Sequence, residues 1–538
     1  MLRTKRYLEK YALLSVFDKN GIVDFASSLI KLGYKIISTG GTAKILAQNN
    51  IKVIPIQEIT GDPESFGGRM KTISFEIESG ILFDRSNLSH IRQATTLNIK
   101  PIDIVVCNLY PFEKTIEDPK VSADTAIENI DVGGPTMIRA AAKNFKNVLV
   151  LTDPDDYDFA IEVLSRHSGE RSDSRIDSGQ ARMTLIELKK SLAAKAFTRL
   201  SFYDSQVARF LNKKLFPEEI TLPGRKTVNL RYGENPHQKA AFYLEPNTNS
   251  VLKNLTRISG RKLSLVNLTD INAGLESVRL FNESSAVIIK HNSPCGIALG
   301  KNVSEALKRA IEADSESAFG GIIVINKPMI LKTARVIWKF RDAKRANIDI
   351  VAAPKITNDA LEYLSKIRKS MGIYTFGSIP KKCVSENIKY VDGGFIIQTA
   401  DLDIDKSFNG WKIATRKKPS LKEIRQMKIA WKFISRIRSN AVIVVDKDLP
   451  MTRGIGSGQT SRIRSVRIAL EQAGKYSNGA ILASDSFFPF DDSVKLAAKY
   501  RISAIVQQGG SINDKLSILA ADKAGISMVF TQRRAFWH

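Results

Sequence analysis

Short apolar runs alternate with amphipathic segments through the first part of the chain, and this alternation limits the possible folds most strongly. Strands are predicted at 12–16, 34–37, 102–107 and 147–152, and helices at 22–32, 43–48 and 136–143. Strands that alternate with helices of this length pair in parallel, because each helix carries the chain back across the sheet. The sequence therefore predicts a three-layer α/β domain that ends near residue 205, with a linker to about residue 225.

A phosphate-binding loop is predicted where the second strand ends. The segment between that strand and the next helix is Ser38–Thr42. Glycines let backbone N–H groups approach an anion, hydroxyl groups add donors, and the helix N-terminus favours negative charge. The segment Arg69–Thr72 adds two cations and a hydroxyl group. The alternative is an ordinary capped helix start, which needs no ligand.

The second part of the chain is organised around the segment Ala286–Gly296. Its apolar residues predict a buried strand, which stops at Lys290, His291 and Asn292 before a Ser-Pro turn. Open α/β sheets bind ligands at such strand ends. An ammonium group disfavours a protonated neighbouring imidazole, so His291 would act as a neutral base while Lys290 faces an oxyanion. The alternative is a solvated Lys-His pair on the surface.

Composition limits the class of protein. The 538 residues are 43% hydrophobic, enough for several packed domains. The sequence has no apolar run of about 18 residues, so no membrane span is expected. The basic start lacks the apolar stretch of a secretory signal. Cys107, Cys295 and Cys383 are far apart, which favours a reducing compartment, so a cytoplasmic protein is expected. The five histidines lack metal-ligand spacing, and no metal site is expected.

The formal net charge of +26 is compatible with nucleic-acid binding or with a solvated cationic surface. Lysine and arginine are spread along the whole chain. The densest run, 412–438, is interrupted by apolar residues at helical spacing, which predicts an amphipathic helix with a basic outer face. No zinc-finger or RNA-binding pattern accompanies it. The solvated surface is therefore favoured, and nucleic acid is not expected as a partner.

Ten motifs, in this order, give the chain a family resemblance. They are Ser38–Thr42, Arg69–Thr72, Cys107–Phe112, Ile130–Gly134, Arg139–Asn144, Leu230–Gln238, Lys290–Pro294, Ser317–Gly321, Gly454–Gln459 and Ser484–Phe490. With them the chain resembles the bifunctional AICAR transformylase/IMP cyclohydrolase family of purine biosynthesis over nearly its whole length.

The resemblance implies an α/β fold in two domains. The first, over 1–205, would be a methylglyoxal-synthase-like (flavodoxin-like) parallel sheet domain with cyclohydrolase activity. The second, over 206–538, would be a transformylase of two cytidine-deaminase-like α/β units without zinc, at about 225–395 and 396–538.

The resemblance also implies two reactions and their partners. A formyl group would pass from 10-formyltetrahydrofolate, a co-substrate, to AICAR, which gives formyl-AICAR and tetrahydrofolate. Dehydrating ring closure would then give IMP. No tightly bound cofactor and no membrane are implied. The family forms homodimers with transformylase sites across the interface, so a homodimer is expected.

By resemblance, the first domain would close the ring with a small catalytic set. Lys143 would transfer protons, helped by Lys71, Tyr110 and Asp131. The nucleotide would be held by Ser15, Asp18, Lys19, Ser38, Thr39, Gly40, Gly41, Arg69 and Thr72, with Cys107 and Asn108 lining its base. The alternative for Lys143 is a helix-terminal lysine that offsets the helix dipole.

By resemblance, the second domain would transfer the formyl group. His291 would take the amine proton, while Lys290 and Asn440 stabilise charge on the formyl oxygen. AICAR would be bound by Arg231, Tyr232, Asn267, Gly320, Asp349, Arg462 and Arg534, the folate by Ile463, Phe487 and Asp492, with His237 and His538 in support.

The first domain departs from the family pattern beside its phosphate site. Where the family usually continues Leu-His-Pro and then a further His, this chain has the segment Ile73–Gly80, with two carboxylates. Phe17 replaces a usual serine and Phe145 a usual histidine. A transformylase with weakened or lost cyclohydrolase is therefore one alternative. Another is a nucleotide- or RNA-binding protein on an inactive scaffold, motivated by the net charge.

Overall fold

A computed structural model describes residues 9–118, 120–168, 184–212, 214–341, 347–380, 386–401 and 404–538. Most of the loop predicted at 166–182, and Cys383, lie outside these ranges. The chain forms two compact units, one of residues 1–225 with 245–247 and one of residues 226–244 with 248–538. The domain boundary predicted near residue 205 falls inside helix α10 (Leu185–Leu211).

Unit 1 is built on the predicted parallel sheet, which is confirmed. Its strands are β1 (Lys10–Leu14), β2 (Tyr34–Ser38), β3 (Val53–Pro55), β4 (Ile102–Val106) and β5 (Leu149–Leu151). All neighbours pair in parallel, in the order β3-β2-β1-β4-β5. This order differs from the 2-1-3-4-5 order of flavodoxin. It reverses between β1 and β4, and such a reversal opens a crevice at the carboxyl ends of the strands.

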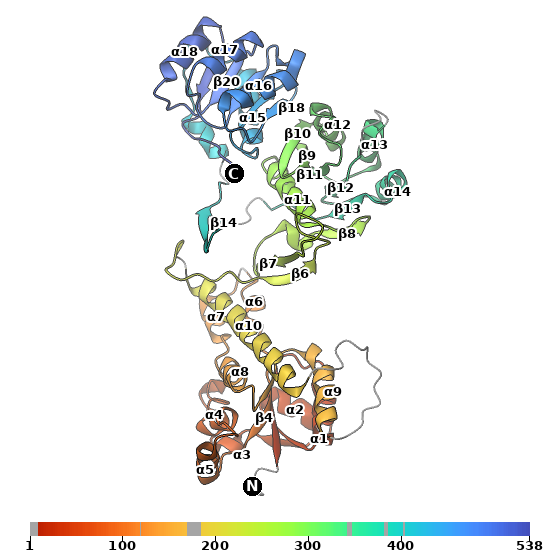
Figure 1. The fold of residues 1–538 in the computed structure, drawn as a ribbon, viewed down its shortest axis with the longest axis vertical. Coiled ribbons are helices and arrows are strands. Elements are labelled where there is room, and N and C mark those ends of the chain that lie inside the picture. Colours follow the sequence, from red (N-terminus) through yellow and green to blue (C-terminus); the bar gives the residue numbers. More distant parts are fainter. Residues whose placement is uncertain are drawn as a thin grey trace. The chain divides into compact units, whose positions relative to one another are not determined.

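Helices cover both faces of this sheet (Figure 1). The helices described in unit 1 are α1 (Ile22–Lys31), α2 (Gly40–Gln48), α3 (Gln57–Thr60), α4 (Phe75–Leu82), α5 (Leu88–Thr96), α6 (Phe112–Thr115), α7 (Ala123–Glu128), α8 (Gly133–Lys143), α9 (Tyr157–Ser168) and α10, of which α5, α6 and α7 lie outside the two sheet-face cores. Ala12 and Leu14 of β1 pack with α1 and α9, while Tyr11 and Leu13 pack with α4 and α8. This alternation follows from the two-residue period of a strand.

Unit 2 contains two six-stranded mixed sheets. The first runs β10-β9-β11-β12-β13-β8 and the second β18-β17-β19-β20-β21-β16. Their strands are β8 (Thr256–Ser259), β9 (Ser284–Lys290), β10 (Ser293–Gly300), β11 (Ile322–Ile325), β12 (Ile350–Ala353), β13 (Gly372–Thr375), β16 (Lys412–Ile413), β17 (Val442–Val445), β18 (Thr452–Gly456), β19 (Ile481–Ser484), β20 (Ala504–Gln507) and β21 (Ser527–Phe530). Two further sheets have two strands each, β6 (Arg225–Asn229) with β7 (Ala241–Leu244) and the antiparallel hairpin of β14 (Glu386–Val391) with β15 (Gly394–Thr399).

The two sheets of unit 2 have one topology, so the predicted pair of α/β halves is confirmed. Each half has a helix, an antiparallel hairpin and three further helix–strand units. The helices are α11 (Leu265–Val278), α12 (Val303–Ala313), α13 (Leu331–Arg341) and α14 (Asn358–Ile367), then α15 (Leu421–Ile434), α16 (Arg462–Ala473), α17 (Asp492–Lys499) and α18 (Asp514–Lys523). Helix α15 is shorter than the helix predicted over 412–438. It begins only after Ser420, which caps it, because Lys412–Ile413 forms a strand that pairs with β21.

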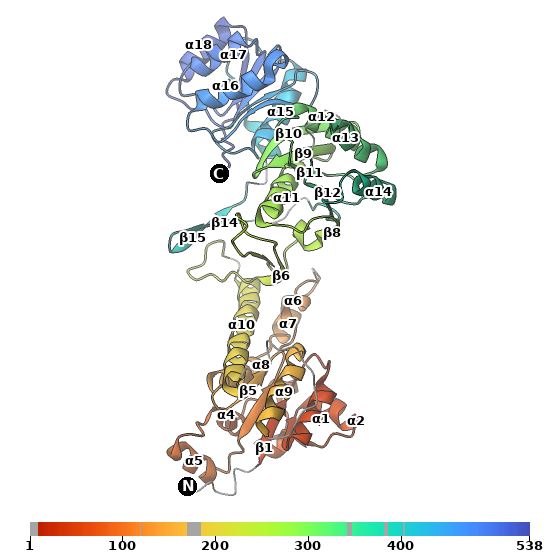
Figure 2. The ribbon, with the colours of Figure 1, turned by 45° about the vertical axis from the view of Figure 1, so that its right-hand side comes forward.

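One hydrophobic core joins the two halves of unit 2. Ile271 and Leu275 of α11 and Met427 and Trp431 of α15 are buried in it, between the two sheets. The helices α12, α13 and α14 cover the outer face of the first sheet, and α16, α17 and α18 the outer face of the second (Figure 2). The halves are therefore packed through a shared apolar centre.

Helix α16 lies directly on strand β18 because β18 contains glycine. A β-carbon at Gly454 would overlap the carbonyl oxygen of Ala469 in α16. We expect Gly454→Ala to lower the free energy of unfolding of unit 2 by about 2 kcal/mol, since added atoms in a packed core force backbone shifts. The measurement is urea unfolding followed by tryptophan fluorescence. All four tryptophans belong to unit 2, so the signal reports on that unit alone.

Gly394→Ala is the matched control for this change. A β-carbon at Gly394, in β15, would meet no atom within 4 Å. The control should leave the unfolding midpoint unchanged. An unchanged midpoint for Gly454→Ala as well would show that the helix–strand contact is not tight.

Candidate functional site

A cavity of about 800 Å³ lies at the carboxyl ends of the unit 1 strands, where the strand order reverses. Parallel sheets place loops from distant parts of the chain at this edge. Eleven of the residues predicted for the cyclohydrolase site line the cavity: Ser15, Lys19, Thr39, Gly41, Arg69, Lys71, Thr72, Cys107, Asn108, Tyr110 and Asp131. The structure therefore brings most of this predicted site together.

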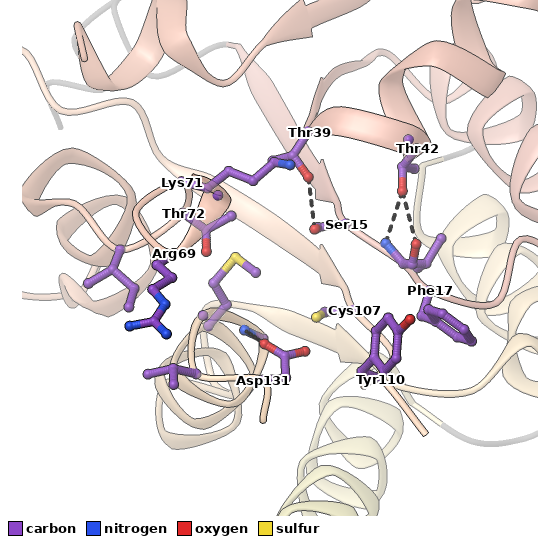
Figure 3. Close-up of a pocket in the computed structure, with 18 of the residues that line it drawn as sticks. Ser15, Phe17, Thr39, Thr42, Arg69, Lys71, Thr72, Cys107, Tyr110 and Asp131 are labelled. Carbon is purple, nitrogen blue, oxygen red and sulfur yellow. Dashed lines mark hydrogen bonds between the residues drawn. The ribbon is translucent and has the colours of Figure 1, made fainter. Parts of the chain in front are cut away.

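Hydroxyl groups tie the loops after β1 and β2 to each other (Figure 3). The Oγ of Ser15 and the Oγ1 of Thr39 are 3.0 Å apart. The Oγ1 of Thr42 accepts a hydrogen bond from the backbone N–H of Val16 and donates to its carbonyl oxygen, both at 3.1 Å. These bonds fix the N-terminus of α2 at the wall of the cavity.

Helix α8 also begins at the cavity, with Gly133 and Gly134. A β-carbon at Gly133 would lie 2.5 Å from the Oγ1 of Thr72, and one at Gly134 would lie 2.5 Å from the Oδ2 of Asp131. The glycines therefore allow a hydroxyl group and a carboxylate to contact the start of the helix. Because α2 and α8 both begin here, backbone N–H groups and helix dipoles favour an anionic ligand.

The cations of the cavity have partners that the sequence did not reveal. The Nζ of Lys71 lies 3.2 Å from the Oε2 of Glu64, and Arg69 forms an ion pair with Glu128. Lys19 donates to the carbonyl oxygen of Phe17 at 3.1 Å, and burial lowers the pKa of this lysine. Glu64 and Glu128 therefore compete with a bound anion for these two cations. This competition follows from the fold and was not predicted from the sequence.

An aromatic pair forms another part of the cavity wall. The rings of Phe17 and Tyr110 have centroids 4.4 Å apart and are tilted by 57°. The Oδ1 of Asn108 accepts hydrogen bonds from the backbone N–H groups of Phe17, at 2.6 Å, and Asp18, at 2.8 Å. Phe17, which replaces a usual serine, is thus held against the predicted catalytic tyrosine.

Asp131 is suited to hold a proton. Burial raises the pKa of its carboxyl group, although the backbone N–H groups of Gly134 and Tyr110 oppose the rise. The Oδ1 of Asp131 accepts from the N–H of Gly134 at 2.8 Å. Burial also raises the pKa of the Cys107 thiol, so this thiol stays neutral in the wall.

Four predicted residues lie outside this cavity lining. Ser38 is buried and donates to the carbonyl oxygen of Leu14 at 2.7 Å. Gly40 has φ of 41°, and a β-carbon there would lie 2.5 Å from the Nζ of Lys71. The backbone N–H of Asp18 bonds to Asn108. Lys143, at the C-terminus of α8, lines a neighbouring cavity of about 490 Å³.

The neighbouring cavity contains a residue from the departing segment Ile73–Gly80. Glu78 and Lys143 both line it, and Asp131 lines both cavities. Burial raises the pKa of Glu78, and its Oε1 has no hydrogen-bond partner among the residues described. Ser74, where the family usually has histidine, caps α4 by accepting from the N–H of Ile77 at 3.1 Å. Phe145 packs against the core of unit 1.

In unit 2, Lys290 and His291 lie at the turn of the hairpin β9–β10, as predicted for a strand end. The Nζ of Lys290 donates to the carbonyl oxygen of Phe319 at 2.8 Å. His291 has φ of 56°. The sequence did not identify Asp270, whose Oδ1 accepts from the N–H of Asn292 at 2.6 Å.

A buried ion pair orients Asn440 just before β17. The Oδ1 of Asn440 accepts from Arg462 at 2.7 Å, and its Nδ2 donates to the carbonyl oxygen of Gln459 at 2.9 Å. Arg462 in turn pairs with Asp485, which is fully buried. Arg462, predicted to bind AICAR, is only 9% exposed and is engaged inside the protein.

Several other predicted residues of unit 2 already have partners. The Oδ1 of Asn267 accepts from the backbone N–H of Ser264, the residue that caps α11, at 3.2 Å. Asp349 forms ion pairs with Arg261 at 2.6 Å and Arg368 at 3.1 Å. The guanidinium of Arg231 donates to the hydroxyl of Tyr232 at 2.9 Å.

The remaining predicted residues lie on loops or at helix starts. Gly320, with φ of 74°, precedes β11. Asp492 and Ile463 are in the first turns of α17 and α16, and Phe487 is half-buried in the loop after β19. In the C-terminal segment Arg534 and His538 both contact the ring of Phe536, while His237 is exposed.

In the part of the chain that the structure describes, His, Cys, Asp and Glu form no group of three or more that could hold a metal ion. The helices described there include none that is long and apolar enough to cross a membrane.

Two family models match this chain. The AICARFT/IMPCHase bienzyme model matches residues 141–472, and the MGS-like domain model matches residues 21–136. The first covers more than half of the chain, and the second covers most of the parallel sheet of unit 1.

Full-length relatives agree with this match. The Bifunctional purine biosynthesis protein PurH of Thermoanaerobacter sp. (strain X514) is 43% identical over 534 residues, 99% of this chain and 100% of its own. Those of Bacillus cereus (strain B4264) and Listeria welshimeri are 42% and 43% identical, over 99% and 98% of this chain and 100% of their own. The crystal structure of ForH is 34% identical, covers 38% of this chain and 100% of its own, and has a TM-score of 0.32, too low to support an argument.

Removing a competing carboxylate should strengthen anion binding in the unit 1 cavity. We expect Glu64→Gln to bind inorganic phosphate about two- to threefold more tightly, because Lys71 loses a partly exposed ion pair. Isothermal titration calorimetry at low ionic strength measures the affinity. Glu9→Gln, which breaks the exposed Lys35 pair outside the cavity, should change nothing. Equal affinities for all three proteins would contradict the competition.

Proposed function

The chain belongs to the family of bifunctional AICAR transformylase/IMP cyclohydrolases, and we propose from its geometry which residues carry each reaction. It catalyses the last two steps of IMP biosynthesis. The observation that carries the proposal for unit 1 is the cavity at the strand-order reversal, lined by the motif residues. Neither the weakened cyclohydrolase nor the inactive binding protein is favoured by the full-length matches.

We propose that unit 1 closes the ring of formyl-AICAR. The phosphate would bind where α2 and α8 begin, with Arg69 leaving Glu128 for it, while Lys71 leaves Glu64 for the reacting oxygen. The carboxamide nitrogen attacks the formyl carbon and loses a proton, while the formyl oxygen becomes an oxyanion. The Lys71 ammonium stabilises this charge. The oxygen then takes up two protons, its bond to the carbon breaks and it leaves as water, while the ring nitrogens lose a second proton and a carbon–nitrogen double bond forms.

Asp131 would supply a proton in this step. Its raised pKa keeps a proton on the carboxyl group to higher pH than an exposed aspartate holds one. Lys143 lines the adjoining cavity, and Asp131 lines both cavities. We therefore place Lys143 one step behind Asp131, as its source of protons, with Tyr110 beside the reacting atoms.

We propose that unit 2 transfers the formyl group from 10-formyltetrahydrofolate. The AICAR amine attacks the formyl carbon, and His291 takes the amine proton. A nitrogen–carbon bond forms, the bond from the formyl carbon to the folate nitrogen breaks, and that nitrogen receives the proton. Lys290 and the second N–H of Asn440 stabilise the oxygen. Hydrogen bonds to Phe319 and Gln459 hold these two donors in place.

We propose further that two chains form a homodimer with transformylase sites across the interface. The family pattern supports this arrangement. It is also consistent with the exposed or half-buried state of Phe487, Asp492 and Arg534, which leaves them available to a ligand or a second chain.

Separate variants should remove one reaction each. We expect His291→Ala to lower formyl transfer at least about 100-fold, since a general base contributes that much. It should leave closure of supplied formyl-AICAR intact. Lys71→Ala should do the reverse, through loss of a charge at the oxyanion. Tetrahydrofolate is followed by absorbance and IMP by chromatography.

One histidine variant and one lysine variant serve as controls for the expected loss of each reaction. His90→Ala and Lys35→Ala change exposed residues outside the proposed sites and should keep both reactions. Loss of both reactions in either active-site variant would contradict the division of labour. Normal ring closure by Lys71→Ala would remove Lys71 from the mechanism.

Mixing inactive variants should restore formyl transfer if sites are shared between chains. His291→Ala and Asn440→Ala, refolded together in equal amounts, should regain about one quarter of the wild-type activity, because half the dimers are mixed and each has one intact site. Each variant refolded alone is the control. No recovery in a sample shown to contain mixed dimers would place His291 and Asn440 of one site on one chain.

A further inference from the structure

A buried carboxylate holds the turn that carries His291. Asp270 lies in α11 and is 5% exposed. Its Oδ1 accepts from the backbone N–H of Asn292 at 2.6 Å, and the backbone N–H of His291 also bonds to the carboxyl group. Asp270 therefore contacts both residues of the loop between β9 and β10.

This turn has an unfavourable backbone conformation. His291 and Asn292 have φ of 56° and 59°, and both are in the left-handed region. A two-residue hairpin of this kind prefers Asn-Gly, because a β-carbon destabilises positive φ. Such a conformation persists where surrounding contacts hold it. Asp270 supplies the contact in this case.

The second half of unit 2 offers an internal comparison. Asp270 and Gln426 each lie six residues after the serine that caps their helix, Ser264 in α11 and Ser420 in α15. Gln426 also contacts the hairpin of its own half, where its Nε2 donates to the carbonyl oxygens of Asp446 at 2.8 Å and Leu449 at 3.0 Å. A neutral amide thus holds the hairpin that lacks the Lys-His pair.

The half with the Lys-His pair has a carboxylate, Asp270, where the other half has an amide, and a carboxylate costs more free energy to bury. A buried carboxylate loses its hydration, and burial raises the pKa of Asp270, although the two backbone N–H groups oppose the rise. An amide would avoid this cost. The carboxylate can accept two N–H groups at once and so fixes two consecutive residues.

We propose that Asp270 is a positioning residue for formyl transfer, which holds the His291–Asn292 turn so that the imidazole meets the AICAR amine. The inference rests on the proposed role of His291. Lys290, the preceding residue, is fixed separately on the carbonyl oxygen of Phe319. Asp270 therefore sets the direction of the imidazole relative to an ammonium group that is already in place.

The test is Asp270→Ala in the full chain, with and without Asn292→Gly. Asp270→Ala should lower kcat for formyl transfer at least about tenfold with KM for AICAR within about twofold, because orientation of the base is lost and substrate binding is not. Glycine favours the left-handed turn by itself. Adding Asn292→Gly should therefore recover several-fold in kcat, which a general loss of stability would not do.

Three controls make the outcome decisive. Gln426→Ala removes the matched contact in the other half and should keep kcat within about twofold while lowering the unfolding midpoint. Tryptophan fluorescence, which comes from unit 2 alone, reports that unit 2 of each variant is folded, and ring closure of supplied formyl-AICAR reports on unit 1. His291→Ala is measured in parallel. If it keeps formyl transfer, the proposed catalytic role fails, and this inference fails with it.

The inference alone is overturned if His291→Ala is inactive and Asp270→Ala keeps wild-type kcat. It is also overturned if the double variant is folded and shows no recovery. If Asp270→Ala does not fold alone, the double variant, with its turn supported by glycine, is compared directly with Asn292→Gly. Equal kcat values then support positioning through the turn, and a kcat at the His291→Ala level overturns it.

Discussion

Three carboxylates that accept backbone N–H or guanidinium donors control the geometry of both candidate sites. A carboxylate removed from water is stable only when donors surround it, so each one fixes the groups that donate to it. Asp131 fixes the start of α8, Asp270 fixes the hairpin with His291, and Asp485 fixes Arg462 and thereby Asn440. These acids hold groups that the proposed mechanism uses. Asp131 is itself proposed to supply a proton in unit 1, whereas Asp270 and Asp485 in unit 2 only hold other groups in place.

Unit 2 shows how one architecture can be used twice with different results. Its halves have the same order of strands and helices, and the first helix of each half, α11 or α15, has the same length and a serine cap. They differ at the hairpin, where one half has a two-residue turn with Lys290 before it and the other has a longer loop from Asp446 to Met451. The shared core stabilises both halves, so the hairpin of one half can hold a strained turn without loss of the fold.

The cations of the unit 1 cavity already have partners before any substrate is added. Lys71 and Arg69 are held by Glu64 and Glu128, and Lys19 by carbonyl oxygens. These partners compete with an anionic substrate for the cations, and this competition lowers the affinity for the substrate. Phe17 and Glu78, which depart from the family pattern, lie on the walls of this cavity and its neighbour. They change its surroundings and leave the proposed reacting groups present.

The sequence alone determined the elements and the motifs. Apolar periodicity predicted four of the five strands described in unit 1, all but β3, and their parallel pairing, and the loop Ser38–Thr42 with Arg69–Thr72 predicted the anion site. Local patterns carry this information because strand, helix and turn preferences depend on near neighbours. They also overestimated the helix at 412–438, since pairing of Lys412–Ile413 with β21 is a long-range contact.

Only the tertiary structure decided which distant residues meet. It separated Lys143 from the main cavity, joined Glu64 to Lys71, and placed Asp270 under a turn that begins twenty-one residues later in the chain, at His291. These contacts depend on strand order and on how helices pack across a sheet, and no spacing in a single sequence specifies them. The residue types in the sequence therefore predicted the reacting groups, while only the fold revealed the groups that hold those residues in place.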